Sequence, residues 1–103
     1  MTTPLVDIHA HRGRFFEVLQ ETERTQTAVM TIAPGQDGGP EETHAGDQVV
    51  YVVEGEAVVT IEGTAHRAAV GACVLIPAGA RHHVRNPSAH PLFFLTVYAP
   101  PAY

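Results

Sequence analysis

Short apolar runs separated by glycine dominate the middle of the chain. Four of these glycines, Gly55, Gly63, Gly71 and Gly79, recur at intervals of eight residues. The runs between them are rich in β-branched residues, which favour strands. Turn residues every ~8–12 positions around such runs are typical of an all-β sandwich or barrel. The pattern therefore predicts strands over residues 49–53, 57–61, 68–70 and 73–76.

The same reasoning extends the strands to both sides of this region. Residues 14–24 place Phe15, Val18 and Leu19 at a helix-like spacing, but the segment lacks an N-cap and also fits a strand, which we favour. About eight antiparallel strands in a chain of this length would form a closed barrel or jelly roll around a small cavity. The additional predicted strands are residues 27–33, 43–44 leading into 48–53, 82–85 and 92–98.

The apolar pattern is that of one domain. We expect residues 1–14 to form a partly ordered N-terminal segment and residues 15–103 to form a single barrel domain. The last predicted strand, residues 92–98, is apolar on both faces, so both faces should be covered. One face would line the barrel. We expect a second copy of the chain to cover the other face, which predicts a homodimer.

Composition and charge narrow the classes of function. The 103 residues carry a formal net charge of −5, which argues against nucleic acid or an anionic membrane as a partner. All six basic residues are Arg, so there is no lysine for a Schiff base or a P-loop. Cys73 is the single cysteine, which excludes an internal disulfide and a cysteine cluster, and its apolar run predicts a buried, inert thiol. No apolar stretch suits a membrane helix or a signal peptide, so we expect a cytoplasmic protein.

Two segments bring histidine together with other side chains that bind metals. In an extended chain Glu42, His44 and Gln48 would point to the same side, because alternate residues share a face. His82 follows a predicted turn and would point inward, while His83 would point outward. Two imidazoles, a carboxylate and an amide oxygen that meet in one cavity would suit a divalent transition metal.

The remaining histidines have simpler expected roles. His9 and His11 lie in the N-terminal segment, where we expect them to be solvated. His66 and His90 lie beside predicted turns and should be exposed.

The residues around these histidines resemble the two motifs of the cupin superfamily, whose members are small double-stranded β-helix barrels. The second motif is matched at every spacing, and the first keeps its spacing but changes two residue types. Glu42 stands where the family has its first histidine, and Gln48 stands where it has its carboxylate. The resemblance covers residues 15–101. The matching positions are Gly71, Pro77, Gly79, His82 and Asn86 in the second motif, and Glu42, His44, Gln48 and Gly55 in the first.

The two departures compensate in charge. Three histidines and one glutamate carry −1 in total, and so do two histidines, one glutamine and Glu42. This favours a retained metal, and the resemblance implies Fe, Mn, Ni or Zn as its identity. Glu42 is either a ligand or a solvated loop acid. Gln48 is either a ligand or an inner amide that orients a bound water or another ligand.

Two classes of function follow from the resemblance. The first is a metal-dependent enzyme that acts on a small organic molecule as an oxygenase, isomerase or lyase. In that class Glu42 would be the base wherever it is not a ligand. The second is a non-catalytic barrel that binds or senses a small molecule with weak metal binding or none. Gln48 in the carboxylate position fits that second class, because an amide is the weaker ligand.

Overall fold

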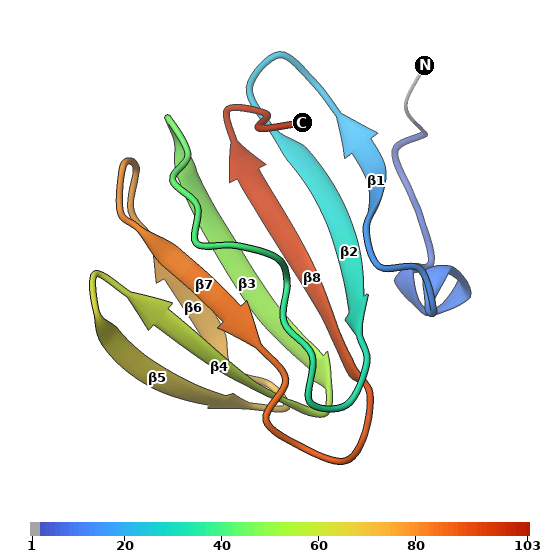
Figure 1. Cartoon of the computed structure of the whole chain (residues 1–103). Coiled ribbons are helices and arrows are strands. Elements are labelled where there is room, and N and C mark those ends of the chain that lie inside the picture. Colours follow the sequence, from blue (N-terminus) through green and yellow to red (C-terminus); the bar gives the residue numbers. More distant parts are fainter. Residues whose placement is uncertain (1–2) are drawn as a thin grey trace.

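The computed structural model describes residues 3–103, which form two antiparallel β-sheets that face each other (Figure 1). The larger sheet has five strands in the order β1-β2-β8-β3-β6, and the smaller has three in the order β5-β4-β7. The predicted all-β jelly-roll architecture is confirmed. Within residues 3–103, no helix has the length and apolar character that a membrane span requires. The elements are a 3₁₀-helix η1 (Ile8–His11) and the strands β1 (Glu17–Glu21), β2 (Gln26–Ile32), β3 (Asp47–Glu54), β4 (Glu56–Ile61), β5 (Thr64–Ala69), β6 (Cys73–Ile76), β7 (His82–Arg85) and β8 (Leu92–Ala99).

Most strands lie where the apolar runs predict them. The segment in which helix and strand competed contains β1, which pairs with β2, so the strand interpretation is confirmed. The glycine spacing marks real turns. Between β4 and β5, for example, Glu62 and Gly63 have φ angles of 47° and 81°. Two successive residues with positive φ angles are characteristic of the tight hairpin turns that match the twist of the flanking strands.

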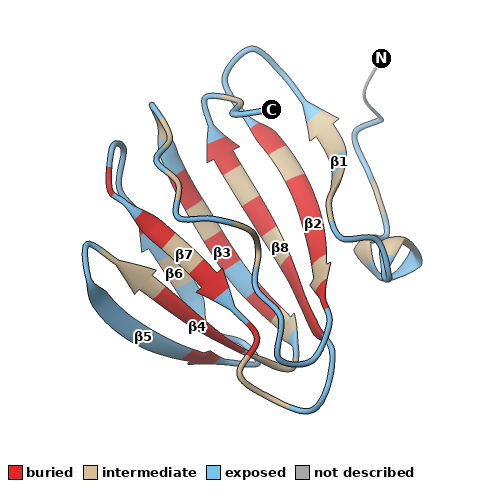
Figure 2. Cartoon of the chain, viewed as in Figure 1, coloured by how far each residue is buried: buried red, intermediate tan, exposed pale blue. Residues whose placement is uncertain are grey.

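Alternate residues of the strands form the core between the two sheets (Figure 2). In β3, Val50 and Val52 are fully buried, while Tyr51 between them is 42% exposed. In β8, which lies between β2 and β3, Phe94 belongs to the same core. Burying an aliphatic or phenyl side chain of this size contributes about 1.5–3 kcal/mol. Polar side chains in this apolar interior therefore need hydrogen-bond partners or a bound ligand to offset the cost of their burial.

The outer face of β8 is covered in part by the chain's own N-terminal segment. Phe93 points away from the core and is nevertheless fully buried. The His9 ring lies 6.4 Å from the Phe93 ring, and the Arg12 guanidinium lies 5.3 Å above it. Arg12 also pairs with Glu54 at 3.1 Å. The expectation that a second subunit covers this whole face is therefore corrected at Phe93, where residues of the same chain do so.

The thiol of Cys73 is exposed, and the prediction of a buried cysteine is wrong. Its apolar run forms β6, which is an edge strand of the larger sheet. Cys73 pairs with Tyr51 on the outer face, and Leu75, two residues further along β6, is 61% exposed. The apolar run covers the core with one face only, which an apolar sequence by itself does not reveal.

Residues 43 and 44 form no strand, contrary to prediction. The segment before β3 crosses from the smaller sheet to the larger one, with an isolated bridge between Glu42 and His82. Gly46 then passes so close to Ala99 and Pro100 that a Cβ atom at Gly46 would overlap the Ala99 carbonyl oxygen. The alternation argument for Glu42, His44 and Gln48 therefore does not hold along one continuous strand.

Candidate metal centre

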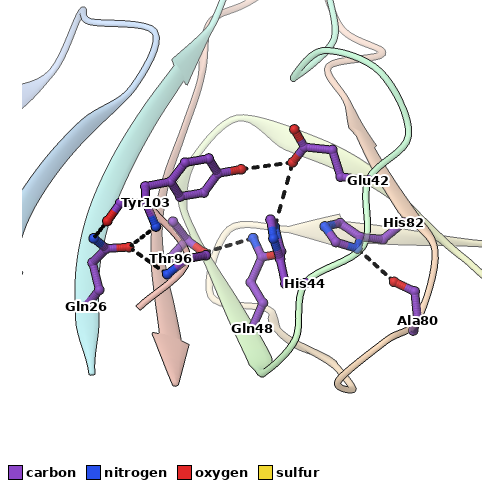
Figure 3. A network of polar contacts seen from close by, with 9 residues as sticks. Gln26, Glu42, His44, Gln48, Ala80, His82, Thr96 and Tyr103 are labelled. Carbon is purple, nitrogen blue, oxygen red and sulfur yellow. Dashed lines mark hydrogen bonds and ion pairs between the residues drawn. The ribbon is translucent and has the colours of Figure 1, made fainter. Parts of the chain in front are cut away.

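A cavity of about 230 Å³ opens between the two sheets, and all four predicted site residues line it. Glu42 and His44 come from the crossing segment, Gln48 from β3 and His82 from the first position of β7. Figure 3 shows these side chains directed toward one another from separate parts of the chain. Aromatic residues make up much of the remaining wall: Phe15, Phe16, Phe94, Tyr98 and Tyr103.

Backbone pairing, in place of strand alternation, brings Glu42 beside His82. The Glu42 amide donates to the His82 carbonyl, and the His82 amide donates to the Glu42 carbonyl, both at 2.9 Å. Directly opposed residues in such a pair carry their side chains on the same face. The Gly79 amide also donates to the His44 carbonyl at 2.8 Å. As a result, ligand atoms of Glu42, His44 and His82 all lie within 4.8 Å of one another.

A hydrogen bond at one ring nitrogen of His82 fixes its orientation in the cavity and would leave the other nitrogen free to hold a metal. The residue is 5% exposed, and its Nδ1 lies 3.0 Å from the Ala80 carbonyl oxygen. A carbonyl oxygen only accepts, so Nδ1 carries the proton and donates it. The neutral ring then keeps its lone pair on Nε2. Metal-binding histidines have this tautomer and this kind of backbone partner.

His44 lies between His82 and Glu42, and its side chain is 12% exposed. Its ring centroid is 5.0 Å from that of His82, and its Nε2 is 3.6 Å from Glu42 Oε2. Burial is the main cause that lowers the pKa of His44, the neighbouring His82 lowers it further, and Glu42 opposes both. The neutral imidazole is therefore favoured, and the neutral ring is the form that binds a metal.

Gln48 lines the cavity and has one unused acceptor atom. The residue is 4% exposed, and its Nε2 donates to Thr96 Oγ1 at 3.0 Å. This bond fixes the amide, while the buried Oε1 has no hydrogen-bond partner. A buried oxygen without a partner costs about 1–3 kcal/mol. A cation or a donor group bound in the cavity would remove that cost, so the donor set fits a metal ion.

Tyr103 and Tyr98 are part of this site and were not predicted. The Tyr103 hydroxyl donates to Glu42 Oε2 at 2.9 Å, and its ring lies 5.6 Å from that of His44. Tyr98 packs edge-on against His44, and burial raises the pKa of Tyr98 to about 12. The apolar face of β8 offered a signal for Tyr98. Residues 100–103 follow the last strand without any periodic pattern, so Tyr103 gave none.

The other histidines lie outside the four-residue group. His83 was expected to point outward, but it is half-buried and also lines the cavity, and its Nε2 lies 3.4 Å from Asp37. His11 is half-buried, and its Nδ1 lies 3.0 Å from Glu17. His66 and His90 are exposed, as predicted. His9 is exposed, as expected, although its ring lies near that of Phe93 and its Nδ1 accepts a hydrogen bond from Arg12.

Comparisons with known proteins agree with this fold. The cupin domain family, Cupin_2, matches residues 28–98. The uncharacterized protein SCO3923 of Streptomyces coelicolor is 30% identical over 92 residues, which cover 89% of this chain and 85% of that protein. The crystal structure of BH2720 from Bacillus halodurans has a TM-score of 0.88 at 30% identity and covers 98% of this chain and 84% of that one.

A further solved structure has the same architecture. It is an RmlC-like cupin family protein with a double-stranded β-helix fold, mj0764 of Methanocaldococcus jannaschii. It has a TM-score of 0.78 at 23% identity, over 86% of this chain and 82% of its own. The family match over residues 28–98 contains Glu42, His44, Gln48 and His82. The chain therefore belongs to the cupin domain family and has its double-stranded β-helix fold.

Proposed function

We propose that this cupin binds a divalent transition metal through Glu42, His44, Gln48 and His82 and acts as a metal-dependent enzyme on a small organic molecule. Cupins often bind metals and commonly bind small-molecule ligands. The observation that carries the proposal is the buried, unpartnered Oε1 of Gln48, a residue that lines the same cavity as two imidazoles and a carboxylate. Within residues 3–103, no other buried side-chain polar atom lacks a hydrogen-bond partner.

The composition of the donor set indicates which metals fit. Two imidazole nitrogens and two oxygens suit Fe(II), Mn(II), Ni(II) or Zn(II) better than they suit copper(I) or an iron–sulfur cluster, which need sulfur ligands. Four protein ligands leave room for a water or substrate atom around a metal that prefers five or six. The aromatic wall and the small cavity fit a compact organic molecule better than a polymer.

A bound metal would supply Lewis acidity, which polarises a carbonyl or an enediol and lowers the pKa of bound water, or it would supply oxygen chemistry. The chain's own residues supply the rest. The aromatic walls exclude water from the buried side of the cavity. Glu42 accepts a proton at a carboxylate oxygen if that oxygen is not used as a ligand. Oxygenase, isomerase and lyase reactions can use the chemistry of a bound metal together with a proton acceptor such as Glu42. We propose that the reaction belongs to one of these three classes.

A non-catalytic binding protein is the second candidate, and Gln48 favours it. An amide oxygen is a weaker ligand than the carboxylate usual at this position, so metal affinity would be lower. A barrel that held a small molecule through Glu42, Tyr103 and the aromatic wall would need no metal. Metal content separates the two candidates.

The test is to purify the protein without a nickel column and measure bound metal by elemental analysis. We expect about one equivalent of metal in the wild type and loss of that metal in His82→Ala, because one of two imidazoles is removed. His66→Ala is the matched control, since it removes an exposed imidazole on β5 that does not line the cavity. It should bind as much metal as the wild type.

The contrary result is equally clear. A wild-type protein that binds none of Fe(II), Mn(II), Ni(II) and Zn(II) after reconstitution would overturn the metal proposal and leave the binding protein. If the metal is present, oxygen uptake with a panel of diketones and phenols tests the oxygenase class first. Product analysis without oxygen then tests the isomerase and lyase classes.

The remaining parts of the proposal concern assembly and place. We propose a cytoplasmic homodimer with no nucleic-acid or membrane partner. The net charge of −5 supports the absence of a nucleic-acid surface. The exposed Tyr51 and Leu75 on the outer face of the larger sheet support a dimer that pairs these faces.

A further inference from the structure

The segment after β8 is tied to the cavity by one buried side chain. Gln26, on β2, is fully buried, although glutamine is usually exposed. Its Oε1 accepts from the amides of Ala102 and Tyr103, at 3.2 Å and 3.1 Å. Its Nε2 donates to the Tyr103 carbonyl at 2.6 Å and to Glu21 at 2.5 Å. One side chain therefore fixes the backbone of two consecutive residues at the edge of the site.

The ring of Tyr103 packs against three other rings. Its centroid lies 4.9 Å from that of Phe16, 5.3 Å from that of Tyr98 and 5.6 Å from that of His44. These are the tilted and edge-on arrangements that aromatic pairs prefer. Tyr103 is 55% exposed, and these three contacts on one side of its ring favour one position for its hydroxyl at the cavity.

In that position the Tyr103 hydroxyl forms a hydrogen bond to Glu42. The Tyr103 hydroxyl lies 2.9 Å from Glu42 Oε2 and donates to it (Figure 3). A carboxylate oxygen only accepts hydrogen bonds, so the phenol is the donor in this pair. Hydrogen bonds to a charged acceptor are stronger than those between neutral groups.

Glu42 needs such a partner if it is to stay over the imidazoles. Its side chain is 42% exposed, and it belongs to the crossing segment, which has one backbone bridge and no regular strand. A glutamate in this position can otherwise rotate into solvent. The hydrogen bond occupies Oε2, the oxygen nearest His44 at 3.6 Å, and leaves Oε1 without a described partner.

We infer that Tyr103 is a positioning residue, held by Gln26, that fixes the Glu42 carboxylate beside His44 and His82 so that it can complete the metal centre. This inference rests on the proposed metal binding. It adds a chain of contacts from β2 through residues 102–103 to a ligand on the opposite side of the cavity. Partners of ligating carboxylates typically contribute 10–100-fold to metal affinity.

The test is to titrate the metal-free protein with Co²⁺ and record both affinity and the visible absorption spectrum. Tyr103→Phe keeps the ring and its packing and removes only the hydroxyl. We expect it to bind Co²⁺ about tenfold more weakly, with a spectrum shifted toward that of Glu42→Gln. Tyr51→Phe is the matched control, because Tyr51 lies on the outer face and its loss of a hydroxyl should leave both readouts unchanged.

A double-mutant cycle separates positioning from a general effect on the fold. In the Glu42→Gln background, Tyr103→Phe should change Co²⁺ affinity by less than about twofold, because the group it positions is gone. If Tyr103→Phe has the wild-type affinity and spectrum, or weakens binding equally in both backgrounds, the inference is wrong. Its failure is distinct from failure of the proposed function, in which the wild type binds no Co²⁺ or Glu42→Gln has no effect.

Discussion

At the scale of single residues, Gln48 is the most informative position in the molecule. Its amide nitrogen is satisfied by Thr96 and its buried oxygen is not. Nearly all buried polar groups in proteins have a partner. A glutamine that only filled the core would gain nothing from this oxygen, whereas a glutamine that contributes a ligand atom would use it.

A carboxylate at position 48 should raise metal affinity and lower the stability of the metal-free protein. We expect Gln48→Glu to bind Mn²⁺ or Co²⁺ about tenfold more tightly, because a charged oxygen is the stronger ligand. Without metal it should be less stable by about 1–3 kcal/mol, because a buried charge has only the Thr96 hydroxyl beside it. Calorimetry and thermal unfolding, with and without metal, measure both effects.

Gln36→Glu adds the same charge on an exposed loop and serves as the control. It should change neither metal affinity nor stability appreciably. If Gln48→Glu behaves like Gln36→Glu in the metal titration, Gln48 does not contribute a ligand atom.

His44 predicts how stability depends on pH in the metal-free protein. Its pKa in the folded state is lowered from the ordinary value of 6.5, mainly by burial. As pH falls below 6.5, the unfolded chain takes up a proton that the folded chain does not. The free energy of unfolding should therefore fall until pH reaches the folded-state pKa. Melting temperatures between pH 7.5 and pH 5 should decline less steeply in His44→Gln, and an unchanged slope would contradict this assignment.

At the scale of elements, strands were predictable and the crossing segment was not. Alternation and turn residues report on local structure, and they located most strands closely. The exception is β5 (Thr64–Ala69), for which residues 68–70 were predicted. The crossing from one sheet to the other depends on how Gly46 packs against Ala99 and Pro100, which are more than fifty positions away. No local pattern contains that contact, so the correct grouping of Glu42 and His44 was reached from an incorrect strand.

The close contact at Gly46 can be tested with two alanine substitutions. Gly46→Ala should destabilise the protein by about 1–3 kcal/mol, because the new Cβ atom overlaps backbone atoms that cannot easily move. It should also weaken metal binding, because the crossing segment carries two of the ligands. Gly38→Ala is the control, since its new Cβ atom would meet Val84 at an ordinary 3.5 Å. Urea unfolding of both variants decides the point, and equal stabilities would contradict it.

At the scale of the whole molecule, the two motifs predicted the fold and four residues around one cavity. They could not predict the third contribution to that cavity, which comes from Gln26 and Tyr103, 77 positions apart. Nor could they predict that η1 and Arg12 would cover Phe93. In both cases a short irregular segment contacts a strand that is distant in the sequence. Such a contact produces no periodic pattern of apolar and polar residues from which it could be predicted.

The outer face of the larger sheet predicts the state of assembly. We expect a dimer in sedimentation velocity and a monomer for Leu75→Glu, because a charge on β6 would be buried between two copies of this face. Leu5→Glu is the matched control at another exposed leucine. A wild-type monomer, or a Leu75→Glu variant that remains dimeric, would contradict a dimer built on this face.

The hydrogen bonds from Gln26 also constrain any peptide that continues past Tyr103, whether natural or fused. Such a peptide must begin at the carbonyl group that Gln26 holds beside the cavity. A carrier domain attached there would obstruct the entry of small molecules. A polyhistidine tag would bring foreign imidazoles within reach of the centre, compete for its ion and imitate an affinity that the protein does not have.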